Sequence, residues 1–162
     1  MPGSPEDTTE FALEAFLPYR LSVVANRASR LFARRYSEAY GLSVPEWRVL
    51  AVLGRFGGLS ATGVTERTAM DKVKVSRAVR TLLDRGLLER QEDAADRRVQ
   101  RLGMTPAGRA LHAAIVPEAR ALEAALLQGL APAERQALHA LLDRLEARLG
   151  EMGAPADAEG PD

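Results

Sequence analysis

Apolar side chains recur at intervals of three and four residues along most of the chain, which is the spacing of an amphipathic helix. The first such run precedes Gly41 and consists of Leu17, Leu21, Val24, Ala28 and Leu31. Because proline suits a first helical turn and glycine suits the end of a helix, the pattern predicts a helix from Pro18 to about Tyr40. The segment "EFALEAF" before it predicts a further short helix.

Three shorter helices follow, two of which begin at marked capping residues. Ser43 and Glu46 have the spacing of a capping box and open the first of them. The second is predicted over residues 60–68. Asp71 is the predicted N-cap of the third, which ends at Gly86.

The hydrophobic period changes after Gly86. The segments "LLER" and "VQRLGMT" predict two short strands, joined by the polar tip "QEDAADRR". Thr105 followed by Pro106 is a strong start signal for a long helix, which Pro117 can kink. Pro132 begins the last helix, whose apolar positions are Leu138, Leu141, Leu142, Leu145 and Leu149.

This order of elements predicts a mainly α protein with a small β-hairpin wing. Three short helices followed by a hairpin form the plan of a winged helix-turn-helix, which we expect over residues 43–104. Long amphipathic helices flank this lobe, over residues 17–42 and 105–150. The chain ends are rich in proline, glycine, alanine and acids, so we expect an N-terminal extension over 1–16 and a disordered tail over 151–162.

The helix after Asp71 has two different faces. A helical wheel places Val75, Ala78, Val79 and Leu82 on one side. No acid lies between Asp71 and Asp84, whereas a solvated face usually interleaves acids that pair with its cations. Long cations with a hydroxyl and a small apolar group suit the major groove of DNA. The candidate DNA-contacting residues are Lys72, Val73, Lys74, Ser76, Arg77 and Arg80.

The predicted hairpin tip adds a second candidate contact. Arg97 and Arg98 would project beside this helix, where arginines of a wing can enter the minor groove. Asp93 and Asp96 are suited to orienting an arginine through a charge-assisted hydrogen bond. An ordinary polar hairpin is the alternative interpretation.

Charge and composition narrow the classes of protein to which the chain can belong. The net charge is zero, but residues 60–110 carry a net charge of +4 and the remainder carries −4, so the positive part surrounds the candidate DNA-binding helix. The absence of cysteine excludes disulfides and thiolate metal sites. No stretch is apolar enough to span a membrane, and the polar, acidic start is unlike a signal peptide, so we expect a cytoplasmic protein.

Catalytic patterns are missing from the sequence. It has only two histidines, His112 and His139, and no glycine-rich phosphate loop or His-x-x-x-His pair, so we expect neither an enzyme nor a bound cofactor. Two alternatives to a DNA-binding regulator stay open. One is a zinc-responsive regulator that uses His112, and the other is a winged-helix protein-interaction module that does not bind DNA.

The run from "EWRVLAVL" through "MDKVKVSRAVRTLLDRGLLERQEDAADRRVQRLGMTPAGRAL" resembles the MarR family of bacterial transcription regulators. The resemblance extends from Leu17 to Leu149. It implies an obligate homodimer with a winged helix-turn-helix in each subunit, bound to a pseudo-palindromic operator. It also implies repression of nearby genes and release by small aromatic acids.

The resemblance also assigns roles to individual residues. Ser76, Arg77 and Arg80 match positions that contact bases or phosphates, and Asp96 and Arg98 match the pair on the wing. Ala95 departs from the pattern, since many relatives have a basic residue there. Contact by the wing is then weaker here or shifted to Arg97.

The flanking helices carry apolar stripes that can serve either a dimer interface or a bundle within one subunit. Two recognition helices about 34 Å apart, one turn of DNA, would give a dimer the specificity that one lobe lacks. With the family resemblance, this favours dimerisation helices over 17–42 and 105–150.

The family usually binds its effector between the dimerisation helices and the DNA-binding lobe. An arginine can hold the carboxylate of an aromatic acid, and a tryptophan or tyrosine can stack on its ring. The alternative is that Trp47 belongs to the core and that the arginines lie on the surface. The candidate effector residues are Tyr19, Arg20, Ser22, Asn26, Trp47, Arg48 and His112.

Overall fold

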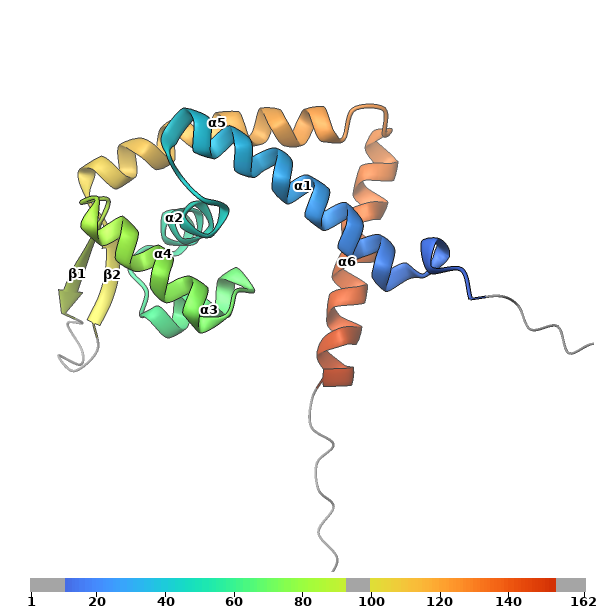
Figure 1. The fold of residues 1–162 in the computed structure, drawn as a ribbon, viewed down its shortest axis with the longest axis horizontal. Helices are drawn as coiled ribbons and strands as arrows, with labels where there is room; N and C mark the ends of the chain where they lie inside the picture. Colours follow the sequence, from blue (N-terminus) through green and yellow to red (C-terminus); the bar gives the residue numbers. More distant parts are fainter. Residues whose placement is uncertain (1–10, 93–99, 154–162) are drawn as a thin grey trace, which may run out of the picture. The chain divides into compact units, whose positions relative to one another are not determined.

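The computed structural model describes residues 11–92 and 100–153, and it confirms the predicted fold class (Figure 1). A two-stranded hairpin follows four helices and precedes two more. The elements are η1 (Leu13–Ala15), α1 (Leu17–Tyr40), α2 (Val44–Phe56), α3 (Ala61–Thr68), α4 (Lys72–Asp84), β1 (Leu88–Glu92), β2 (Gln100–Met104), α5 (Pro106–Leu126) and α6 (Pro132–Gly153).

The predicted elements differ from the observed ones mainly at their ends. The short N-terminal helix is a single 3-10 turn, η1, and α6 continues to Gly153, past the predicted end near residue 150. α5 runs through Pro117 as one helix. No helix within residues 11–92 and 100–153 is long and apolar enough to cross a membrane.

Side-chain caps start α2 and α4 where the sequence predicted. The Ser43 hydroxyl accepts a hydrogen bond from the Glu46 backbone N–H, and the Glu46 carboxylate accepts one from the Ser43 N–H, which completes the capping box of α2. Asp71 Oδ1 accepts a hydrogen bond from the Lys74 backbone N–H at 2.8 Å and caps α4.

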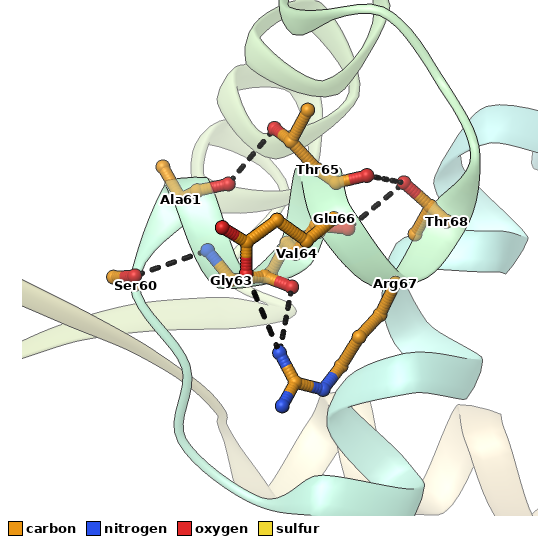
Figure 2. A network of polar contacts seen from close by, with 8 residues as sticks. All are labelled: Ser60, Ala61, Gly63, Val64, Thr65, Glu66, Arg67 and Thr68. Carbon is orange, nitrogen blue, oxygen red and sulfur yellow. Dashed lines mark hydrogen bonds and ion pairs between the residues drawn. The ribbon is translucent and has the colours of Figure 1, made fainter. Parts of the chain in front are cut away.

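The short helix α3 is held largely by its own polar groups, which Figure 2 shows. The Ser60 hydroxyl caps it by accepting a hydrogen bond from the Gly63 N–H at 3.1 Å. The hydroxyls of Thr65 and Thr68 donate to carbonyls one turn earlier, and Arg67 donates to the Gly63 carbonyl. These bonds help a segment of low helix propensity to stay helical.

Contacts divide the chain into two compact units after Ala119. The first unit contains a core in which α2, α3, α4 and the hairpin meet. α1 contributes Tyr36 to this core, and α5 contributes Ile115. In the second unit α6 has no buried residue, and Leu138, Leu141, Leu142 and Leu149 are exposed along it.

The strands β1 and β2 pair antiparallel, from Leu88 opposite Met104 to Glu92 opposite Gln100. Leu59, just before α3, adds a bridge to Leu102, with hydrogen bonds of 3.2 and 2.7 Å in the two directions. The hairpin is therefore fastened to the start of the helix-turn-helix.

Candidate nucleic-acid interface

The two faces of α4 are those that the helical wheel predicted. Val75, Ala78, Val79 and Leu82 are buried. The opposite face is exposed, and even its apolar member, Val73, keeps 59% of its surface. The exposed residues are Lys72, Val73, Lys74, Ser76, Arg77 and Arg80.

A groove of about 600 Å³ lies between α3, α4 and the hairpin. α4 contributes Ser76, Arg80 and Asp84 to it. The facing walls are Thr62 and Thr65 of α3 together with Arg90 and Gln100 of the hairpin.

A second, more open hollow of about 360 Å³ lies on the outer face of α4. Lys72, Ser76 and Arg80 line both hollows, whereas Val73 and Arg77 line only the outer one. The polar side chains of α4 thus have solvent on both sides.

The cations of α4 differ in their partners. The Lys74 ammonium lies 3.4 Å from the Asp71 carboxylate. The hydrogen bond from the Lys74 backbone N–H lowers the pKa of Asp71, so this carboxylate stays charged. The side chains of Lys72, Arg77 and Arg80 make no hydrogen bond or ion pair with any described residue. These three positive charges are available to an anionic partner.

The wing tip lies outside the described residues. Asp96, Arg97 and Arg98 belong to the segment 93–99, so their predicted contacts with DNA stay predictions. On the described part of the hairpin, Arg90 of β1 donates a hydrogen bond to Gln100 Oε1 of β2 at 3.1 Å. This bond directs a polar cross-strand pair along the groove beside α4.

Two of the candidate effector residues meet in an aromatic cluster, which consists of Phe32, Tyr36, Trp47 and His112. The rings of Trp47 and His112 stack with centroids 5.7 Å apart, and Tyr36 lies 5.5 Å from Trp47. Phe32 continues the cluster at 5.9 Å from Tyr36. Phe32 and Tyr36 were not among the predicted site residues, although their spacing of four residues on α1 places them on one face of that helix.

The other candidate effector residues do not join this cluster. Ser22 and Asn26 share a hydrogen bond of 3.4 Å on the exposed side of α1. Tyr19, Arg20 and Arg48 are exposed, and within residues 11–92 and 100–153 no hydrogen bond, ion pair or ring contact links them to the cluster. Their predicted roles stay predictions.

His112 of α5 is half-buried against α2. Gly54 of α2 lies directly against the imidazole, and a Cβ at that position would overlap the ring. Burial lowers the pKa of His112, because desolvation disfavours the charged imidazolium.

This lowered pKa predicts a pH-dependent stability. The unfolded chain binds a proton near the ordinary pKa of about 6.5, while folded His112 stays neutral to a lower pH. The free energy of unfolding should therefore fall as the pH drops below that value, until His112 also titrates in the folded state. Denaturant titrations between pH 5 and pH 8 measure this slope.

A His112→Phe variant should lose part of the slope and keep the ring packing. The control is His139→Gln, which removes a histidine exposed on α6. An unchanged slope in His112→Phe would show that another group causes the pH dependence.

No group of three or more His, Asp or Glu residues within the described part of the chain is placed to hold a metal ion. The zinc-responsive alternative thus gains no support from the geometry.

The chain is similar to known transcription regulators in sequence and in structure. Residues 40–99 match the sequence model of the MarR family. A relative from Thauera aromatica, whose name links it to transcriptional regulation of the hcr operon, is 30% identical over 118 residues, which are 73% of this chain and 71% of that protein.

Solved structures are similar over most of the chain. A MarR family transcriptional regulator from Silicibacter pomeroyi DSS-3 is 36% identical, with a TM-score of 0.70 over 84% of this chain and 99% of that one. BpsR of Bordetella bronchiseptica, whose DNA binding is regulated by 6-hydroxynicotinic acid, is 30% identical. Its TM-score is 0.77, over 84% of this chain and 96% of that one.

Proposed function

This chain belongs to the MarR family of transcription regulators, and on that premise we propose that it reads a pseudo-palindromic operator as a homodimer, with one α4 for each half-site. Members of the family are regulators rather than enzymes, and they bind DNA and act as dimers. The proposal extends to repression of neighbouring genes in the cytoplasm and to dimerisation through the segments 17–42 and 105–150.

One observation carries the proposal: α4 buries its apolar side and exposes Lys72, Arg77 and Arg80, whose side chains bind no other described residue. In the major groove, Arg77 and Arg80 can each donate two hydrogen bonds to guanine O6 and N7. Ser76 can donate or accept, and Val73 can touch a thymine methyl group. Lys72, at the helix start, suits a backbone phosphate, and the wing residues Asp96, Arg97 and Arg98 would add contacts in the minor groove.

The proposed effector is a small aromatic carboxylate. Its support is the regulation of the similar protein BpsR by 6-hydroxynicotinic acid, together with the Trp47 and His112 rings in this chain. A ring would stack on Trp47, and Arg20 or Arg48 would hold the carboxylate. Such a ligand releases DNA only to the extent that it prefers the dimer geometry that fits DNA poorly.

Salt dependence of DNA binding tests the regulator against a winged-helix module that does not bind DNA. Each phosphate neutralised contributes about −0.9 to the slope of log K against log salt concentration. We expect tight binding to a selected operator and a steep negative slope, measured by fluorescence anisotropy at several ionic strengths. A protein-interaction module would show no DNA affinity that depends on salt.

The effector is tested on the same complex. A thermal-shift screen of aromatic carboxylates, including 6-hydroxynicotinate, identifies ligands, and each is then tested for release of operator DNA. Ligands that raise the melting temperature and leave DNA binding intact would contradict the proposed role of the effector.

A further inference from the structure

A set of hydrogen bonds joins three helices at the C-terminal end of α4. Arg85, the residue after α4, donates from Nη1 to the Gly41 carbonyl at 2.9 Å and from Nη2 to the Tyr40 carbonyl at 3.1 Å. The Tyr40 hydroxyl donates to the Glu118 carboxylate of α5 at 2.6 Å. All of these residues lie in the unit that ends at Ala119.

The same end of α4 is also fastened to the start of α5. The Thr105 hydroxyl donates to the Gly86 carbonyl at 2.7 Å, and the Thr105 N–H donates to the Leu87 carbonyl at 3.1 Å. Arg85 therefore connects the end of α4 to the end of α1, and Tyr40 connects the end of α1 to the middle of α5. Thr105 connects the turn after α4 to the start of α5. We name these three residues, with Gly41 and Glu118, the helix junction.

The helix junction differs in kind from the other contacts of α4. The buried face of α4 packs on α2, α3 and β1 through apolar side chains, and such contacts are non-directional. Hydrogen bonds weaken steeply when their angle changes, so Arg85 with its two acceptors restrains the direction of the helix end. Among the described residues, no other hydrogen bond links α4 or its C-terminal turn to α1.

Arg85 is also separated from the proposed DNA contacts. It lies five residues beyond Arg80, a rise of about 7.5 Å along the helix axis. Its guanidinium is already engaged with two backbone carbonyls, and it is solvent-exposed. Loss of such exposed bonds should cost little stability, so a positioning role can be measured apart from folding.

Resting on the proposed function, we infer that Arg85 and Tyr40 are positioning residues for DNA recognition. They set the direction of α4 relative to α1 and α5, and hence the spacing at which the two recognition helices of a dimer meet DNA. A dimer with rigidly directed helices accepts one separation of half-sites, whereas a dimer with loosened helices accepts several.

The test uses the full-length dimer and operators selected by it, with the spacer between half-sites lengthened or shortened by one or two base pairs. Arg85→Lys keeps the charge but replaces the planar guanidinium with a point donor, and Tyr40→Phe removes only the hydroxyl. For both variants we expect a loss of about fivefold on the preferred spacing and a flatter spacing profile. Affinity for random DNA and its salt slope should match those of the wild type.

The control is Arg55→Lys, because Arg55 is exposed near the end of α2, outside the proposed DNA contacts and dimerisation segments, and its guanidinium lies over the ring of the adjacent Phe56. Its spacing profile should equal that of the wild type. Profiles of Arg85→Lys and Tyr40→Phe that equal the wild-type profile would overturn the positioning role. So would an equal loss on operator and random DNA, since it would place Arg85 on a phosphate. A wild-type protein that selects no DNA would instead refute the proposed function, and the positioning role with it.

Discussion

Replacing Gly108 with alanine should lower the free energy of unfolding by about 3 kcal/mol, the upper range for overpacking a well-filled site. Gly108 is buried in the first turns of α5, and a Cβ there would overlap the Leu87 carbonyl oxygen. The obstacle is backbone rather than the mobile end of a side chain, so relief requires α5 to move away from the turn after α4. Helix propensity alone predicts the opposite sign, because alanine is favoured over glycine by about 1 kcal/mol.

Urea titration followed by circular dichroism measures this change, with variants compared at one protein concentration because the proposed dimer would make stability depend on concentration. The matched control is Gly150→Ala on α6, where a Cβ meets no atom within 4 Å. That variant should be more stable than the wild type by up to about 1 kcal/mol. A Gly108→Ala variant as stable as the wild type would show that α5 does not approach Leu87 so closely.

Gly108 also illustrates what the sequence could not predict. Its neighbours in "TPAGRAL" predict a helix start, and the structure confirms this start at Thr105. Nothing in that segment indicates that the Leu87 carbonyl presses on position 108, because the contact joins residues far apart in the chain. The same is true of Gly54, which faces His112 from another helix.

Features that depend on residues close together in the sequence were predicted well. The caps at Ser43 and Asp71 and the buried side of α4 follow from spacings of three and four residues, which the sequence displays directly. The fold class follows in turn, since the order of helices and strands is set by such local signals. The candidate DNA-contacting face was predicted for the same reason, as it is one side of one helix.

The candidate effector residues lie on several helices, so the sequence alone does not indicate which of them meet. Trp47 and His112 lie on α2 and α5 and do meet. Tyr19 and Arg20 share an exposed face of α1, while Tyr36 of the same helix faces the core. The sequence shows that α1 is amphipathic but not which part of its stripe packs inside the subunit. No sequence pattern indicates the hydrogen bonds of Arg85, since its acceptors are backbone carbonyls more than forty residues away.

The second large expected effect concerns Arg80. Arg80→Ala should weaken operator binding by about 1–3 kcal/mol and relax sequence preference at the base it reads. Arg80 is exposed, has no partner among the described residues and lines both hollows of α4, so its guanidinium can reach a base edge. Alanine would leave guanine O6 and N7 without their donors inside the complex.

Arg80→Lys separates base reading from simple attraction of charge. Lysine keeps the positive charge but lacks the planar pair of donors that matches two acceptors of one guanine. We therefore expect Arg80→Lys to bind random DNA as the wild type does and to lose much of the preference for the operator. Binding is compared on operator, on operators with single substitutions and on random DNA at one salt concentration, because affinity for DNA depends on salt. If Arg80→Ala loses equal affinity on all three and lysine restores it, Arg80 contacts a phosphate, and the reading of bases falls to Ser76 and Arg77.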